Sequence, residues 1–215
     1  MKRFTPSFQG RPWNGDRVLH VYALPDQDTD AALLALADAC HAAMTPYPIR
    51  ALDHDQLHVT VEMVTDATAD AIGDSERGVL FEALREKLAA AKPVHTEIGH
   101  PYSNRAGVLF DVWPDQDLLN VRALVRDAVR EVRGDGAVLH AGGRPHMALG
   151  YSWDTADSDP LNSTLRAITP RRVPVTISRL HLLEVTFTQQ PLADGHSSWD
   201  ISWTPIAVLP LGRGN

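Results

Sequence analysis

An internal repeat is the feature that most constrains the fold of this chain. The tetrapeptide Pro-Asp-Gln-Asp occurs at residues 25–28 and again at residues 114–117, an offset of 89 (114 minus 25). Each copy follows an apolar, strand-like run, residues 18–24 in one case and 107–113 in the other. Each copy also precedes a stretch with helical spacing of apolar residues. This repeated order predicts two related halves rather than a chance match.

The repeat continues into two short strands that each carry a histidine. Predicted helices near residues 28–43 and 117–133 lead to apolar strands near 57–64 and 145–151. His58 and His146 are 88 residues apart (146 minus 58), within one residue of the tetrapeptide offset. We therefore expect duplicated halves that span about 18–64 and 106–151.

The remaining segments complete an α+β fold. Further helices are predicted near residues 75–91 and 161–168, and further strands near 94–99, 173–187 and 199–209. Together these segments predict one domain over residues 16–209. It would have two lobes built from duplicated strand-helix-strand halves, with antiparallel sheets around a central cleft. Residues 1–15 and 210–215 are predicted to be loose termini.

Composition and charge restrict the partners of the chain. Its 215 residues carry a formal net charge of −7, which argues against a general grip on long nucleic acid. Its one cysteine, Cys40, cannot form an intramolecular disulfide. Neither a signal peptide nor an apolar run of the roughly 20 residues that a membrane helix needs is present in the sequence. These observations favour a cytoplasmic protein without a membrane partner.

The two histidine strands present the residues that could carry out chemistry. Side chains alternate along a strand, so His58, Thr60 and Glu62 share one face of the first strand, and His146 and Ala148 share one face of the second, opposite Tyr151. By the same alternation, His20 and Tyr22 share a face of the strand near residues 18–24 and could line the cleft. Two histidines from matched strands suit phosphodiester chemistry, since one can take a proton while the other gives one near neutral pH. The Thr60 hydroxyl can donate a hydrogen bond to a phosphoryl oxygen. Such a site needs no metal or other cofactor.

The segments His58-Val59-Thr60-Val61 and His146-Met147-Ala148-Leu149 resemble the paired His-x-Thr/Ser-x motifs of the two-histidine phosphoesterase superfamily. They are most similar to the branch of bacterial 2'-5' RNA ligase-like enzymes and cyclic phosphodiesterases. The resemblance covers about residues 18–209. It implies a two-lobed α+β fold and a metal-independent enzyme that uses His58, His146 and Thr60. The implied partner is a small nucleotide or short RNA with a cyclic phosphate or a 2'-5' linkage.

The second motif departs from the family pattern. Ala148 stands where the family has Thr or Ser, and alanine cannot donate a hydrogen bond from its side chain. The missing contact could come from Tyr151, Ser152, a backbone amide or a nearby arginine, Arg144 or Arg50. We place Ala148, Tyr151 and Arg144 among the expected substrate-binding residues.

Two other functions stay open on the sequence alone. The Ala148 departure also fits a catalytically weak module that binds nucleotides or RNA ends. His54 and His58, four residues apart, suggest a metal-dependent hydrolase if they lie on a helix, but the β-rich sequence that follows disfavours one. The expected enzyme is a monomer whose precise substrate the sequence does not specify.

Overall fold

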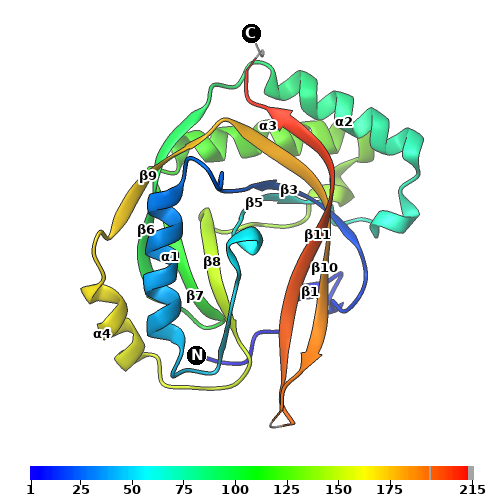
Figure 1. The fold of residues 1–215 in the computed structure, drawn as a ribbon. Coiled ribbons are helices and arrows are strands. Elements are labelled where there is room, and N and C mark those ends of the chain that lie inside the picture. Colours follow the sequence, from blue (N-terminus) through cyan, green and yellow to red (C-terminus); the bar gives the residue numbers. More distant parts are fainter. Residues whose placement is uncertain (194, 213–215) are drawn as a thin grey trace.

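The computed structural model describes residues 1–193 and 195–212, so residues 213–215 of the predicted loose C-terminus lie outside it. Four α-helices and a large curled sheet make up the described part of the chain (Figure 1). The elements are β1 (Ser7–Phe8), β2 (Arg11–Pro12), β3 (Val18–Ala23), α1 (Ala31–Met44), β4 (Ile49–Ala51), β5 (Val59–Met63), α2 (Asp74–Leu88), β6 (Val94–Ser103), β7 (Gly107–Trp113), α3 (Gln116–Arg133), β8 (His146–Ser152), α4 (Asp159–Ala167), β9 (Arg172–Ile177), β10 (Arg179–Pro191) and β11 (Ser197–Pro210).

Strands β3 to β11 form one antiparallel sheet, whose two sides meet at a narrow junction. The strand order is β11-β10-β3-β5-β8-β7-β6-β9, and β4 pairs with the edge of β8. Strands β5 and β8 join the two sides through the pair Val59 and Met147. The expected α+β architecture with two antiparallel lobes is therefore confirmed, with the sheet continuous through that junction.

Each half supplies the helix that covers the other half. Helix α1 follows β3 in the chain but packs against β6, β8 and β9. Helix α3 follows β7 but packs against β5. The buried faces of these helices have the apolar spacing noted in the sequence: Leu33, Leu36 and Cys40 on α1, and Val121, Val125 and Val129 on α3. This exchange of helices holds the two lobes together, although few sheet hydrogen bonds cross the junction between β5 and β8.

Matched β-bulges follow the two histidines. In the β3–β5 pairing the register shifts so that Val61 has no partner residue, and in the β7–β8 pairing Leu149 has none. Each bulge lies three residues after its histidine. A bulge adds one residue to one strand and so reverses which face later side chains occupy. The repeat therefore extends to the irregularities of the two strands.

The prediction that residues 1–15 are loose is wrong. Phe8 is 1% exposed and Trp13 is 3% exposed, and the two rings lie within a cluster of buried side chains. Trp13 Nε1 donates to the carbonyl of Asp16 at 2.7 Å. Large aromatic side chains gain most from burial, so this short polar-looking segment packs onto the sheet.

The start of the predicted C-terminal loose end is also ordered. Pro210 is the last residue of β11, and Leu211 is buried and donates its backbone N–H to the carbonyl of Ser178 at 2.9 Å. Among residues 1–193 and 195–212, no helix is long and apolar enough to cross a bilayer.

Candidate active site

His58 and His146 line one cavity of about 360 Å³ between the lobes. The pairing of Val59 with Met147 places the two histidine strands side by side. In an antiparallel ladder this register sets Ala148 opposite His58, and Thr60 opposite His146. All four residues line the cavity. The structure thus brings together the predicted pair of histidines, their threonine and the alanine that departs from the family pattern.

Both imidazoles are oriented by the same backbone contact. His58 Nδ1 lies 2.8 Å from the carbonyl of Gln56, and His146 Nδ1 lies 3.0 Å from the carbonyl of Arg144. A carbonyl only accepts, so in each neutral ring the proton sits on Nδ1 and Nε2 carries the lone pair. Each Nε2 is therefore left available as a proton acceptor, or as a donor once protonated.

The two histidines differ sharply in environment. His58 is 5% exposed, stacks on Tyr22 with ring centroids 4.3 Å apart, and meets Trp203 edge-on at 5.4 Å. Burial lowers the pKa of His58 to about 4, with a smaller lowering from His146 and an opposing effect of the Gln56 carbonyl. His146, in contrast, is exposed to solvent. The buried ring therefore stays neutral at pH 7.

Tyr151 and Arg144, the other predicted substrate contacts, take different positions. Tyr151 lines the cavity because the bulge at Leu149 turns it onto the face of His146, whereas strict alternation placed it on the opposite face. The Arg144 guanidinium instead pairs with Asp115 at 3.2 Å and lies over the ring of Trp113. Arg144 borders a small neighbouring cavity of about 40 Å³ that His146 also lines.

The family-model comparison decides the affiliation of the chain. Residues 46–186, more than half of its length, match the model described as the 2'-5' RNA ligase superfamily. The chain belongs to the 2'-5' RNA ligase superfamily. No curated protein matches it as a sequence relative.

Solved structures share the fold of this superfamily member at low sequence identity. TT0787 of Thermus thermophilus is similar with a TM-score of 0.59 and 16% identity, covering 92% of this chain and 100% of that one. LigT of E. coli in its apo form is similar with a TM-score of 0.58 and 10% identity, covering 92% and 99%. The structure of LigT with 3'-AMP gives a TM-score of 0.58 at 12% identity, with the same coverage. These likenesses support the fold assignment.

In this superfamily member, the carbonyl that orients His58 is itself held in place. The Gln56 side chain donates to Asp200 Oδ1 at 3.0 Å and to the carbonyl of Ile201 at 2.7 Å. Arg50 donates to the same Asp200 oxygen at 2.9 Å. Arg50 is thus engaged in positioning β11 against the turn before His58.

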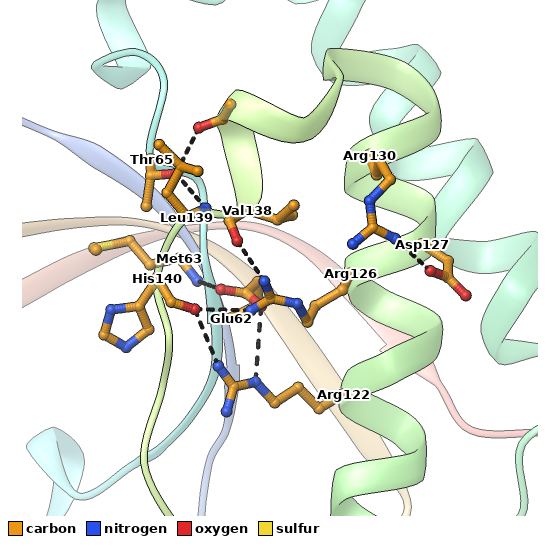
Figure 2. Close-up of polar contacts among 11 residues, drawn as sticks. Glu62, Met63, Thr65, Arg122, Arg126, Asp127, Arg130, Val138, Leu139 and His140 are labelled. Atoms are coloured by element: carbon orange, nitrogen blue, oxygen red, sulfur yellow. Dashed lines mark hydrogen bonds and ion pairs between the residues drawn. The ribbon is translucent and has the colours of Figure 1, made fainter.

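A buried ion pair stabilises the segment of the chain that leads to His146. Glu62, turned onto the helix side of β5 by the bulge, accepts from Arg126 at 2.7 Å and lies 3.7 Å from Arg122 (Figure 2). Arg126 also donates to the carbonyls of Val138 and His140. Helix α3 therefore fixes the position of Val138 and His140, in the segment that leads to His146. The prediction that Glu62 shares the face of His58 is wrong, because it assumed a strand without a bulge.

The His54–His58 metal hypothesis is not supported by the positions of these residues. His54 lies in a 3-10 turn, where Nε2 contacts Asp38 Oδ1 at 2.7 Å, while His58 Nδ1 faces Gln56. Among the residues described, no group of three or more His, Cys, Asp or Glu side chains is placed to hold a metal ion. These contacts leave His54 outside the cavity that His58 lines.

Several lining residues were not singled out as site residues from the sequence. His140 lies in an irregular loop without periodicity, and Phe4 lies in a segment expected to be loose. Tyr22 and His20, which the alternation along β3 places on one face as candidates to line the cleft, do line the cavity. None of the described residues around the larger cavity is Asp, Glu, Lys or Arg. Its polar groups are imidazoles, hydroxyls and backbone.

Proposed function

We propose that this chain is a metal-independent phosphodiesterase or 2'-5' RNA ligase-like enzyme. Its substrate would be a 2',3'-cyclic phosphate, a 2'-5' phosphodiester or a related cyclic nucleotide. The observation that carries the proposal is the pair of imidazoles, each with Nδ1 tied to a backbone carbonyl, that line one cavity with Thr60. That arrangement leaves two Nε2 atoms to move protons at a common phosphorus.

The unequal burial of the histidines suggests their roles in hydrolysis. His58 is neutral at pH 7 and would take the proton of the attacking water. The water oxygen bonds to phosphorus as the bond to the leaving ribose oxygen breaks. His146, in its protonated form, would give a proton to that oxygen, and Thr60 would donate a hydrogen bond to a phosphoryl oxygen. In the ligation direction the two roles exchange.

The charge of the cavity favours phosphodiesters over phosphomonoesters. A cyclic phosphodiester carries one negative charge, whereas a phosphomonoester carries nearly two at pH 7. The described lining offers no Lys or Arg side chain to balance a second charge. A small nucleotide or a short RNA end therefore fits better than a long polyanion, in line with the net charge of −7. We propose that the protein acts on such partners as a cytoplasmic monomer.

A catalytically weak binding module is the second candidate. It is favoured by Ala148, which faces the cavity without a hydroxyl at the position related to Thr60 by the repeat. Losing one hydrogen-bond donor to a transition state costs on the order of 10²–10³ in rate. Such a module would bind cyclic nucleotides saturably and release them unchanged.

A product screen on a panel of cyclic phosphates distinguishes the two candidates. We expect turnover that is insensitive to EDTA and that falls by about 10²–10⁴ in His58→Ala and in His146→Ala. His95→Ala is a matched control, because His95 is an exposed histidine that bonds Thr176 on β9, outside the cavity lining. If either active-site variant kept full activity, the two-histidine mechanism would be wrong. Binding without product would favour the second candidate.

A further inference from the structure

The N-terminal segment crosses from one lobe to the other. The backbone N–H of Phe4 donates to the carbonyl of Ser152, at the end of β8, at 2.7 Å. The Arg3 guanidinium donates to the hydroxyl of Ser197, at the start of β11, at 2.5 Å. Since β8 and β11 lie on opposite sides of the junction between β5 and β8, these contacts tie the segment to both lobes (Figure 1). We call residues 2–7 the N-terminal strap.

Aromatic packing holds the strap in this position. Phe4 stacks on Tyr151 of β8 with ring centroids 4.2 Å apart, and its ring lies 5.8 Å from that of Phe187 on β10. Trp13 packs edge-on against Phe187 at 4.9 Å and donates its backbone N–H to the carbonyl of Pro6 at 2.9 Å. Rings from both lobes therefore fix the strap, in addition to its hydrogen bonds.

The strap forms a wall at one end of the cavity. Residues 4–7 line the cavity, and the strap meets β8 at Ser152, its last residue, whereas His146 is its first. At the His146 end the site borders the smaller cavity, which is lined by residues 142–144, two of them glycines. The cleft is therefore walled at the Ser152 end and bordered by a loop with few side-chain atoms at the other.

The phosphodiesters of the proposed function make different demands on such a cleft. In a 2',3'-cyclic phosphate both ester oxygens belong to one ribose, so an RNA chain leaves the phosphorus in a single direction. In an internal 2'-5' linkage the phosphorus joins two riboses with further nucleotides on each side, so the chain must leave the cleft in two directions. A wall across one end admits the first kind and clashes with the second.

We propose that the N-terminal strap makes this enzyme specific for ends: it admits a mononucleotide or an RNA end with a 2',3'-cyclic phosphate, and it excludes a phosphodiester inside a longer RNA chain. This inference rests on the proposed function and narrows its substrate class. The strap lies outside residues 46–186, which match the superfamily model, so this selectivity comes from a part of the chain that the family model does not cover.

A comparison of three substrates tests the selectivity. They are a nucleoside 2',3'-cyclic phosphate, a short RNA that ends in a 2',3'-cyclic phosphate, and a short RNA with one internal 2'-5' linkage and a 3'-hydroxyl end. All three carry the base that is turned over fastest in the product screen. We expect the parent protein to turn over the first two, and to cleave the third with a kcat/KM at least about 100-fold lower.

Opening the strap should change this selectivity. We expect the double variant Arg3→Ala/Phe4→Ala, which removes side-chain contacts to both lobes, to raise kcat/KM for the internal linkage, relative to that for the mononucleotide, by about tenfold or more. Deletion of residues 2–5, which leaves β1 in place, should raise the same ratio. Arg11→Ala is the matched control and should leave the ratio unchanged, because this exposed arginine of β2 pairs with Asp16, outside the cavity lining.

The outcomes separate this inference from the proposed function. If the parent protein cleaves the internal linkage as readily as the cyclic end, the inference is wrong while the phosphodiester site stands. An unchanged ratio in both opened variants, or the loss of all activity in both, would also overturn it, since the strap would then be a structural element only. If no cyclic phosphate in the product screen is turned over, both proposals fail.

Discussion

At the scale of single residues, the burial of His58 governs how the site depends on pH. The folded protein holds the pKa of His58 at about 4, below the ordinary value of 6.5, because the ring lies between Tyr22 and Trp203 away from water. A general base works only when unprotonated, so activity is present above the folded pKa and is lost as pH falls through it.

We therefore expect the acid limb of the kcat/KM profile to fall near pH 4 rather than near pH 6.5. The measurement is kcat/KM against pH for a cyclic phosphate turned over in the product screen. Trp203→Ala is the comparison, because it admits water beside His58 and should move the acid limb upward. An acid limb at pH 6.5 in the unaltered protein would show that His58 is not the base.

Ala148 gives a second prediction at this scale. It is only partly buried, lines the cavity and lies opposite His58, so a larger side chain has room there. Ala148→Thr adds a hydroxyl donor, and we expect kcat to rise by about tenfold or more. Ala148→Val is the matched control, since it has the same branched shape without the donor. Equal rates in the two variants would show that a donor at residue 148 does not assist the reaction.

At the scale of elements, the two histidine strands, β5 and β8, each contain a β-bulge that their alternating sequence pattern does not reveal. The sequence predicted the positions of β5 and β8, and it predicted that His58 and Thr60 lie on the strand face that borders the cleft. It did not predict the bulges at Val61 and Leu149, because a bulge depends on pairing with a neighbouring strand rather than on local composition. The side chain of Glu62 was consequently assigned to the wrong face.

The misassigned Glu62 belongs to the part of the fold that presents His146. It is 1% exposed and faces Arg126 and Arg122 of helix α3 (Figure 2). Removing one partner from a buried ion pair leaves the other charges uncompensated. We therefore expect Glu62→Gln to lower the free energy of unfolding by about 2–4 kcal/mol.

Urea denaturation checks this value against a control in helix α3, the helix that carries Arg126. Asp127→Asn removes the exposed pair with Arg130, in which the two side chains are 57% and 43% exposed, and should change stability by less than about 0.5 kcal/mol. If Glu62→Gln changed the free energy of unfolding as little as the control does, the contacts between α3 and the segment around His140 would contribute little to stability.

At the scale of the whole molecule, the sequence predicted the duplicated α+β plan but not how the halves are interlocked. Its repeat indicated two lobes, whereas the exchange of α1 and α3 between them depends on long-range packing that no local pattern reports. The N-terminal segment was missed for the same reason. Phe8 and Trp13 lie among polar residues and lack periodicity, yet both are buried, and Trp13 lines the cavity.

The central claim is that two imidazoles from duplicated strands act on one phosphorus. The most direct measurement is a crystal structure of the protein with a nucleoside–vanadate complex, which mimics the five-coordinate transition state of phosphoryl transfer. We predict His58 Nε2 and His146 Nε2 each within hydrogen-bond distance of a different vanadate oxygen, about 2.6–3.2 Å away. A complex in which only one imidazole reaches the vanadate, or in which it binds outside this cavity, would contradict the account.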